Sequence, residues 1–80
     1  MDSIIEYTYQ ELRIIRNVFN DPKEREKAVK NLIVFIGENY SKQRNYRVVC
    51  FILDKVSKNG AKIDEAIKIL DYWNLTQPKK

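Results

Sequence analysis

The sequence predicts an all-α fold, a compact bundle of three to four short antiparallel helices in a single domain. Apolar residues recur three and four positions apart along most of the chain, which is the period of one helix face. Residue types that begin or end helices interrupt this period at several places. The connections between the helical segments are short, and short connections favour antiparallel neighbours.

The chain is large enough for one core, so we expect residues 1–77 to form the domain and residues 78–80 to form a frayed basic tail. Hydrophobic residues make up 44% of the chain and charged residues 32%, a balance that is typical of a folded protein. A domain this small buries only about 60% of its unfolded surface, so its margin of stability is narrow.

The first helix is predicted over residues 3–19, where a polar stripe faces away from an apolar one. It ends before Pro22, because proline disfavours helical geometry in the residue that precedes it. The core residues predicted for this helix are Ile4, Ile5, Leu12, Ile15, Val18 and Phe19.

The second helix is predicted to begin at Pro22, because proline suits the first helical position. Asp21 stands where a side chain can cap this helix, and Glu24 completes the spacing of a capping box. Near its end, Gly37 either stops the helix or permits a close contact with another helix. The predicted buried residues are Ala28, Val29, Leu32, Ile33, Ile36 and Tyr40.

The third helix is predicted from about Ser41, which can cap it, to Lys58. Residues 48–53 also have the composition of a strand, but helix signals on both sides favour a helix. Asn59 and Gly60 are expected to end this helix in the left-handed conformation that glycine adopts readily. The predicted core residues are Val49, Ile52, Leu53 and Val56.

The fourth helix is predicted from Ala61 or Asp64 to Asn74. Asp64 and Glu65 fall in its first turn, where the positive end of the helix dipole favours carboxylates. The inward-facing residues predicted for this helix are Ile63, Ala66, Ile67, Leu70 and Trp73.

The missing residue types argue against an enzyme. The chain contains no histidine, which removes the usual general base near neutral pH and the commonest metal ligand. Its one cysteine, Cys50, cannot build a structural zinc site, and its two glycines cannot form a phosphate-binding loop. We therefore expect a non-enzymatic protein without catalytic residues, cofactor or metal ion.

A cytoplasmic location is expected. A single cysteine cannot form an intramolecular disulfide, the usual stabiliser of small secreted domains. The first residues lack the basic start and apolar stretch of a signal peptide, and no apolar run approaches the roughly 20 residues that span a bilayer. We expect no contact with a membrane. Compact domains without motifs are common products of viruses and mobile elements, and such an origin is compatible with the size of this chain.

Positive charge is concentrated in residues 41–60, which hold five basic residues and one acidic residue. At about 100° per residue, the basic residues of the third helix surround one aromatic ring on the side opposite the core. This basic stripe is the predicted partner-binding surface, and it consists of Arg44, Arg47, Phe51, Lys55 and Lys58.

Three interpretations of the basic stripe are open. Its lysines and arginines can simply solvate an outer face, with Phe51 covered by another helix. They can instead bind an acidic protein, or they can bind the phosphates of a nucleic acid while Phe51 stacks on an unpaired base. A helix-turn-helix around Asn59 and Gly60 is disfavoured, because Asp64 and Glu65 would then face phosphates.

The apolar stripes of the first two helices are wider than one small core requires. We expect Ile14, Val34 and Phe35 to support a homodimer, and Tyr7 adds to the same excess. The predicted function is therefore that of a small intracellular interaction protein that associates with itself and binds a protein partner. The alternative is a nucleic-acid-binding module that uses the basic stripe.

Overall fold

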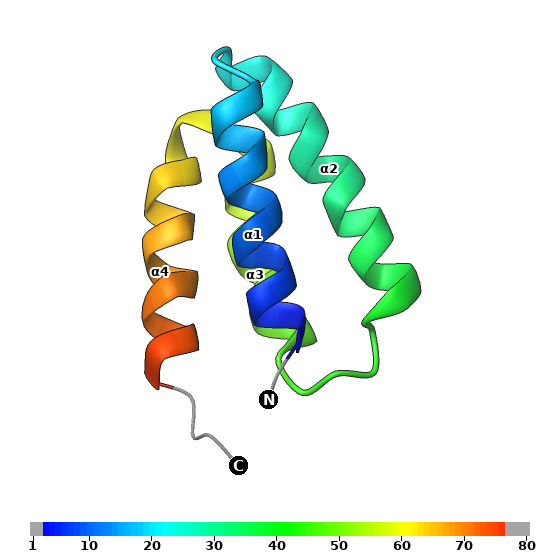
Figure 1. The fold of residues 1–80 in the computed structure, drawn as a ribbon. Coiled ribbons are helices and arrows are strands. Elements are labelled where there is room, and N and C mark those ends of the chain that lie inside the picture. Colours follow the sequence, from blue (N-terminus) through cyan, green and yellow to red (C-terminus); the bar gives the residue numbers. More distant parts are fainter. Residues whose placement is uncertain (1–2, 77–80) are drawn as a thin grey trace.

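Residues 3–76, the part of the chain that the computed structural model describes, form four α-helices that run alternately up and down (Figure 1). These residues contain no strand, so the predicted all-α bundle of antiparallel helices is confirmed. The predicted basic tail, residues 78–80, lies outside the described residues. The elements are α1 (Ser3–Val18), α2 (Pro22–Asn39), α3 (Tyr46–Lys58), the short 3-10 helix η1 (Gly60–Lys62) and α4 (Ile63–Thr76).

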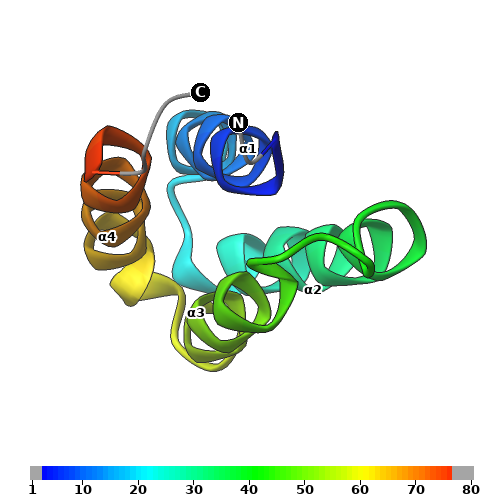
Figure 2. The ribbon, with the colours of Figure 1, turned by 90° about the horizontal axis from the view of Figure 1, so that it is seen from below.

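The helices pack as two pairs that face each other across the core. α1 lies along α4 and α2 lies along α3, as the view from below shows (Figure 2). On the outside, an ion pair between Arg16 Nη1 and Asp64 Oδ1, 3.2 Å apart, links α1 to α4. All four helices contribute to the core, which consists of Ile4, Ile5, Leu12, Ile15, Val29, Leu32, Ile36, Val49, Ile52, Leu53, Val56, Ile63, Ala66, Ile67 and Leu70.

Most of the predicted core is confirmed. The residues predicted to be buried on the third and fourth helices are buried, except that Trp73 packs half-buried against the core. The prediction for Val18 is wrong, since its side chain is 64% exposed. Val18 is the last residue of α1 and lies at the edge of the apolar stripe, so no neighbouring helix covers it. Four residues predicted to be buried on the first two helices are half-buried at the margin of the core: Phe19, which follows α1, Ala28, Ile33, and Tyr40, which follows α2.

The end of α1 is capped by an arginine of α2. Arg25 Nε donates to the Phe19 carbonyl at 2.7 Å, and its Nη2 donates to the Arg16 carbonyl at 3.1 Å. A cation at this end of a helix also interacts favourably with the helix dipole. α2 begins at Pro22 as predicted, but the Asp21 side chain does not form the expected capping hydrogen bond.

The predicted start of the third helix at Ser41 is wrong, because α3 begins at Tyr46. The chain must reverse direction between α2 and α3, and residues 40–45 make that reversal. The backbone amide of Gln43 donates to the Tyr40 carbonyl at 3.0 Å, and the backbone amide of Tyr46 donates to the backbone carbonyl of Gln43 at 3.1 Å. Gln43 Oε1 also accepts from the Ile4 amide at 3.2 Å, which joins this connection to the start of α1.

Gly60 is required for close approach and not for a left-handed turn. No residue in the range 3–76 has the positive φ that was predicted for Asn59 and Gly60. Asn59 is extended, with φ −150° and ψ 95°. Gly60 packs directly on the start of α2, where a β-carbon would overlap the backbone of Pro22. Its amide donates to Glu26 Oε2 at 2.9 Å, so η1 is held against α2 by a hydrogen bond as well as by packing.

Replacing Gly60 with alanine is expected to lower the free energy of unfolding by about 2–3 kcal/mol, because the added methyl group would overlap the Pro22 backbone. Gly37→Ala is the matched control. Its methyl group would lie 3.3 Å from the Tyr46 hydroxyl, at the end of a side chain that can move, and alanine would favour the helix by about 1 kcal/mol. Urea unfolding measures both variants. Equal losses of stability would show that close approach at Gly60 is not the constraint.

Thr8 on α1 is fully buried, and its hydroxyl has no hydrogen-bond partner among residues 3–76. A buried hydroxyl without a partner costs about 1–3 kcal/mol, and valine has nearly the same shape without this group. Thr8→Val is therefore expected to raise the free energy of unfolding by about 1 kcal/mol, measured by thermal and urea unfolding. Thr8→Ser, which keeps the hydroxyl and removes a methyl group, is expected to lower it. A clear loss of stability in Thr8→Val would mean that the hydroxyl is hydrogen-bonded after all.

Candidate interaction surface

α3 carries most of the basic stripe, on the side of the helix opposite its buried face. Phe51 is 64% exposed, so no neighbouring helix encloses its ring. Lys55 Nζ lies 4.6 Å from the centre of that ring, within the range of a cation–π interaction. Arg47 and Lys58 are exposed on the same helix. Four of the five stripe residues thus share α3.

Two features reduce the positive charge expected of the basic stripe. Arg44 is exposed, but it lies in the connection before α3, so the prediction that it belongs to the helix is wrong. The acidic residue of this segment, Asp54, lies on the exposed side of α3, and its Oδ2 is 3.1 Å from Lys58 Nζ. Among the stripe residues on α3, the cations without an ion pair inside residues 3–76 are therefore Arg47 and Lys55.

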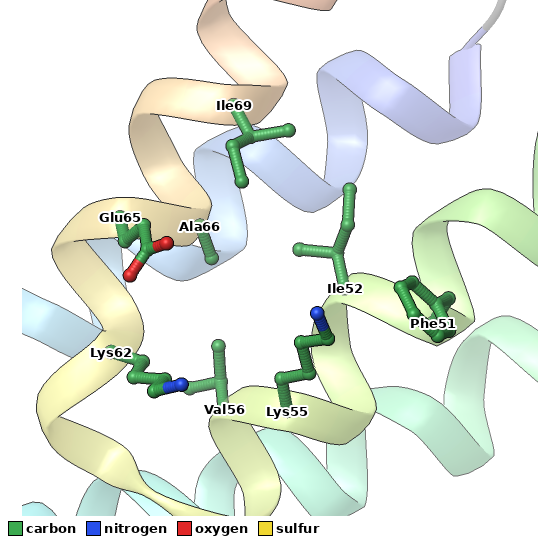
Figure 3. A pocket seen from close by; sticks show the side chains of 8 residues that line it. All are labelled: Phe51, Ile52, Lys55, Val56, Lys62, Glu65, Ala66 and Ile69. Atoms are coloured by element: carbon green, nitrogen blue, oxygen red, sulfur yellow. The ribbon is translucent and has the colours of Figure 1, made fainter.

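An apolar groove lies between α3 and α4, next to the basic stripe (Figure 3). Phe51, Ile52 and Val56 line it from α3, and Ala66 and Ile69 line it from α4. The cavity in this groove has a volume of about 120 Å³. Ala66 is the smallest residue of the lining and contributes only a methyl group to the space between the two helices.

Charged side chains stand at the rim of the groove. Lys55 rises from α3 beside Phe51, and Lys62 extends from η1 toward Val56 (Figure 3). Glu65 is the acidic residue of the lining, on the α4 side. Neither lysine forms an ion pair with any residue of the described range. The groove therefore combines an apolar floor with two ammonium groups that form no ion pair among residues 3–76, and that of Lys55 lies over the Phe51 ring.

The α4 side of the groove was not predicted from the sequence. Lys62, Glu65 and Ile69 are three and four positions apart, so the pattern indicates that they share one side of a helix. Ile69 falls outside the predicted inward stripe, and it is 39% exposed. The spacing alone could not show that this side faces α3, because that depends on how the helices pack.

The residues predicted for self-association have different environments. Phe35 belongs to an aromatic cluster between α1 and α2, with its ring centre 5.5 Å from that of Tyr7 and 6.4 Å from that of Tyr40. Burial in this cluster raises the pKa of Tyr7 above its ordinary value. Ile14 and Val34 are 52% and 60% exposed. Val34 and Phe35 are consecutive in α2, so their side chains diverge by about 100° and do not share one face.

A second, wider hollow between α2 and α3 has a volume of about 530 Å³. Ile33 is its one apolar lining residue, so the hollow can bury little apolar surface of a partner. Three of the charged lining residues already have partners in the fold: Glu26 accepts from the Gly60 amide, and Asp54 pairs with Lys58. The remaining lining residues are Lys30 and Ser57.

The thiol of Cys50 takes part in a contact within α3. A side-chain hydrogen bond between Tyr46 and Cys50 raises the pKa of Tyr46 above its ordinary value. In the described range, no three histidine, cysteine, aspartate or glutamate side chains come together in a way that could hold a metal ion.

The groove between α3 and α4 is therefore the candidate site that combines apolar lining with unpaired charge. No family model matches the chain, and no curated protein or solved structure is similar enough to it to count as a match.

Proposed function

We propose that the protein is a non-enzymatic interaction domain that binds an acidic protein partner at the groove between α3 and α4. The observation that supports this proposal is the pairing of an apolar floor with the unpaired ammonium groups of Lys55 and Lys62. Buried apolar contacts provide most of the affinity of a protein interface, and complementary charge at the rim selects the partner. A cytoplasmic partner is part of the proposal, since the chain has a single cysteine.

Nucleic-acid binding is the alternative, and the exposed ring of Phe51 among cations is the observation that favours it. Two contacts weigh against it. Lys55 occupies a position over the Phe51 ring, where a base would otherwise stack, and Asp54 and Glu65 place carboxylates close to where phosphates would bind. An acidic protein can avoid those carboxylates by placing its own charges opposite the lysines.

The test is recovery of partners from the native host by the tagged full-length chain, with and without nuclease. The wild-type chain is expected to recover a discrete protein that survives nuclease and moderate salt. Phe51→Ala/Ile69→Ala is expected to lose it, because these changes remove apolar lining from the groove. Val18→Ala/Leu75→Ala is the matched control, since these residues are 64% and 73% exposed and do not line the groove.

Three outcomes of this experiment contradict the proposal. Recovery that disappears with nuclease and falls steeply as salt increases would favour nucleic acid bound at the basic stripe. Equal recovery by the groove variant and by the control would place the contact elsewhere on the surface. Loss of the partner in both variants would point to exposed apolar residues in general and not to the groove.

Self-association is a second part of the proposed function, supported by the exposure of Ile14 and Val34. Apolar side chains of this size stabilise a dimer when a second copy covers them, by about 25 cal/mol per Å² of buried apolar surface. Light scattering at high micromolar concentration is expected to give the mass of a dimer for the wild-type chain. Ile14→Glu/Val34→Glu is expected to give a monomer, and Leu75→Glu, which carries a charge at another exposed position, is expected to remain dimeric. A monomeric wild-type mass would reject this part of the proposal.

A further inference from the structure

The size of the groove limits what can enter it. Its cavity of about 120 Å³ is close to the roughly 150 Å³ of an apolar protein cavity that holds benzene. One large side chain fills such a space, whereas a helix that inserts several side chains needs a longer channel. The hollow lies over Ala66, and the large side chains of Ile52, Val56 and Ile69 surround it.

The charges at the rim limit what can lie beside that side chain. Lys55 and Lys62 come from different elements, α3 and η1, so cations stand at two places along the groove (Figure 3). Glu65 would repel a carboxylate on the α4 side. Because opposite charges attract most strongly where apolar surroundings exclude water, carboxylates next to the inserted side chain would meet these two lysines.

We infer that the groove recognises a short acidic segment of a partner protein that inserts one large apolar side chain over Ala66 and places flanking carboxylates on Lys55 and Lys62. This inference rests on the proposed function and specifies the occupant of the same groove. The apolar side chain provides affinity by burial, and the carboxylates select for acidic sequences. Phe51, which borders the groove and is largely exposed, covers one side of the inserted group.

The test uses three synthetic peptides and the full-length protein. The first peptide is Gly-Glu-Glu-Leu-Glu-Glu-Gly, the second has alanine in place of leucine, and the third has lysine in place of every glutamate. Backbone amide chemical shifts followed by NMR give the affinity and the location of each peptide. The leucine peptide is expected to bind at least about tenfold more tightly than the alanine peptide and to shift residues of the groove, because only leucine fills the hollow.

Two variants separate the roles of the hollow and the rim. Ala66→Ile fills the hollow and is expected to remove the preference for leucine over alanine while leaving the charge unchanged. Lys55→Glu/Lys62→Glu is expected to weaken binding of the leucine peptide at least about tenfold. Lys23→Glu/Lys42→Glu changes the net charge by the same amount at exposed positions that do not line the groove, and it is expected to have a much smaller effect. Circular dichroism confirms that each variant is folded before binding is compared.

Equal binding of the leucine and alanine peptides by the wild-type chain overturns the inference, as does no binding of the leucine peptide at millimolar concentration. Equal weakening by the two charge variants overturns the role of the rim lysines. If Ala66→Ile does not fold, Ile69→Ala provides the second measurement, and it is expected to reduce the preference for leucine.

The failure of this inference can be distinguished from failure of the proposed function. A host partner that is lost in Phe51→Ala/Ile69→Ala, together with no preference for leucine, would keep the groove as the binding site and reject the single inserted side chain. Preference for leucine at the groove without any groove-dependent host partner would keep the recognition chemistry and reject the proposed role in the host.

Discussion

The contact between Gly60 and the start of α2 is the constraint on which the arrangement of the second half of the chain depends. The backbone of η1 can lie against Pro22 because Gly60 has no side chain. The Glu26 carboxylate accepts a hydrogen bond from the Gly60 backbone amide, which this packing would otherwise leave without a partner. η1 in turn determines where α4 begins and where Lys62 stands. One end of the groove between α3 and α4 is therefore positioned by a contact with α2, which does not line the groove.

The groove and the core share residues, so the candidate binding surface is continuous with the interior. Ile52, Val56 and Ala66 are buried in the core cluster, and they also line the groove. Because protein interiors are close-packed, the size of each shared side chain affects both the core and the groove. The methyl group of Ala66 therefore contributes both to the stability of the bundle and to the shape of the candidate site.

The helices and most of the core could be predicted because they depend on local spacing and on residue types at helix ends. Ile52 and Val56 lie on the apolar side of their helix wherever its partners are, and both are buried. The function of Gly60 could not be predicted, because the residue type indicates a turn while the partner, Glu26, is 34 positions away. Phe51 is exposed, as the nucleic-acid interpretation of the basic stripe required, whereas Arg44 lies outside the helix that was predicted to carry it. The groove could not be predicted, because its shape depends on the distance between α3 and α4, and the spacing of residues within one helix does not give that distance.

The pairing of α1 with α4 joins the two ends of the described chain. α2 and α3 are neighbours in sequence and can pack after a short connection, whereas the Arg16–Asp64 ion pair joins residues 48 positions apart. Closing the larger loop costs more chain entropy than closing the local hairpin of α2 and α3. One wall of the groove belongs to α4, so the candidate site depends on this long-range pairing. A ligand that binds there stabilises the docked position of α4 by mass action, which couples occupancy of the groove to the integrity of the whole bundle.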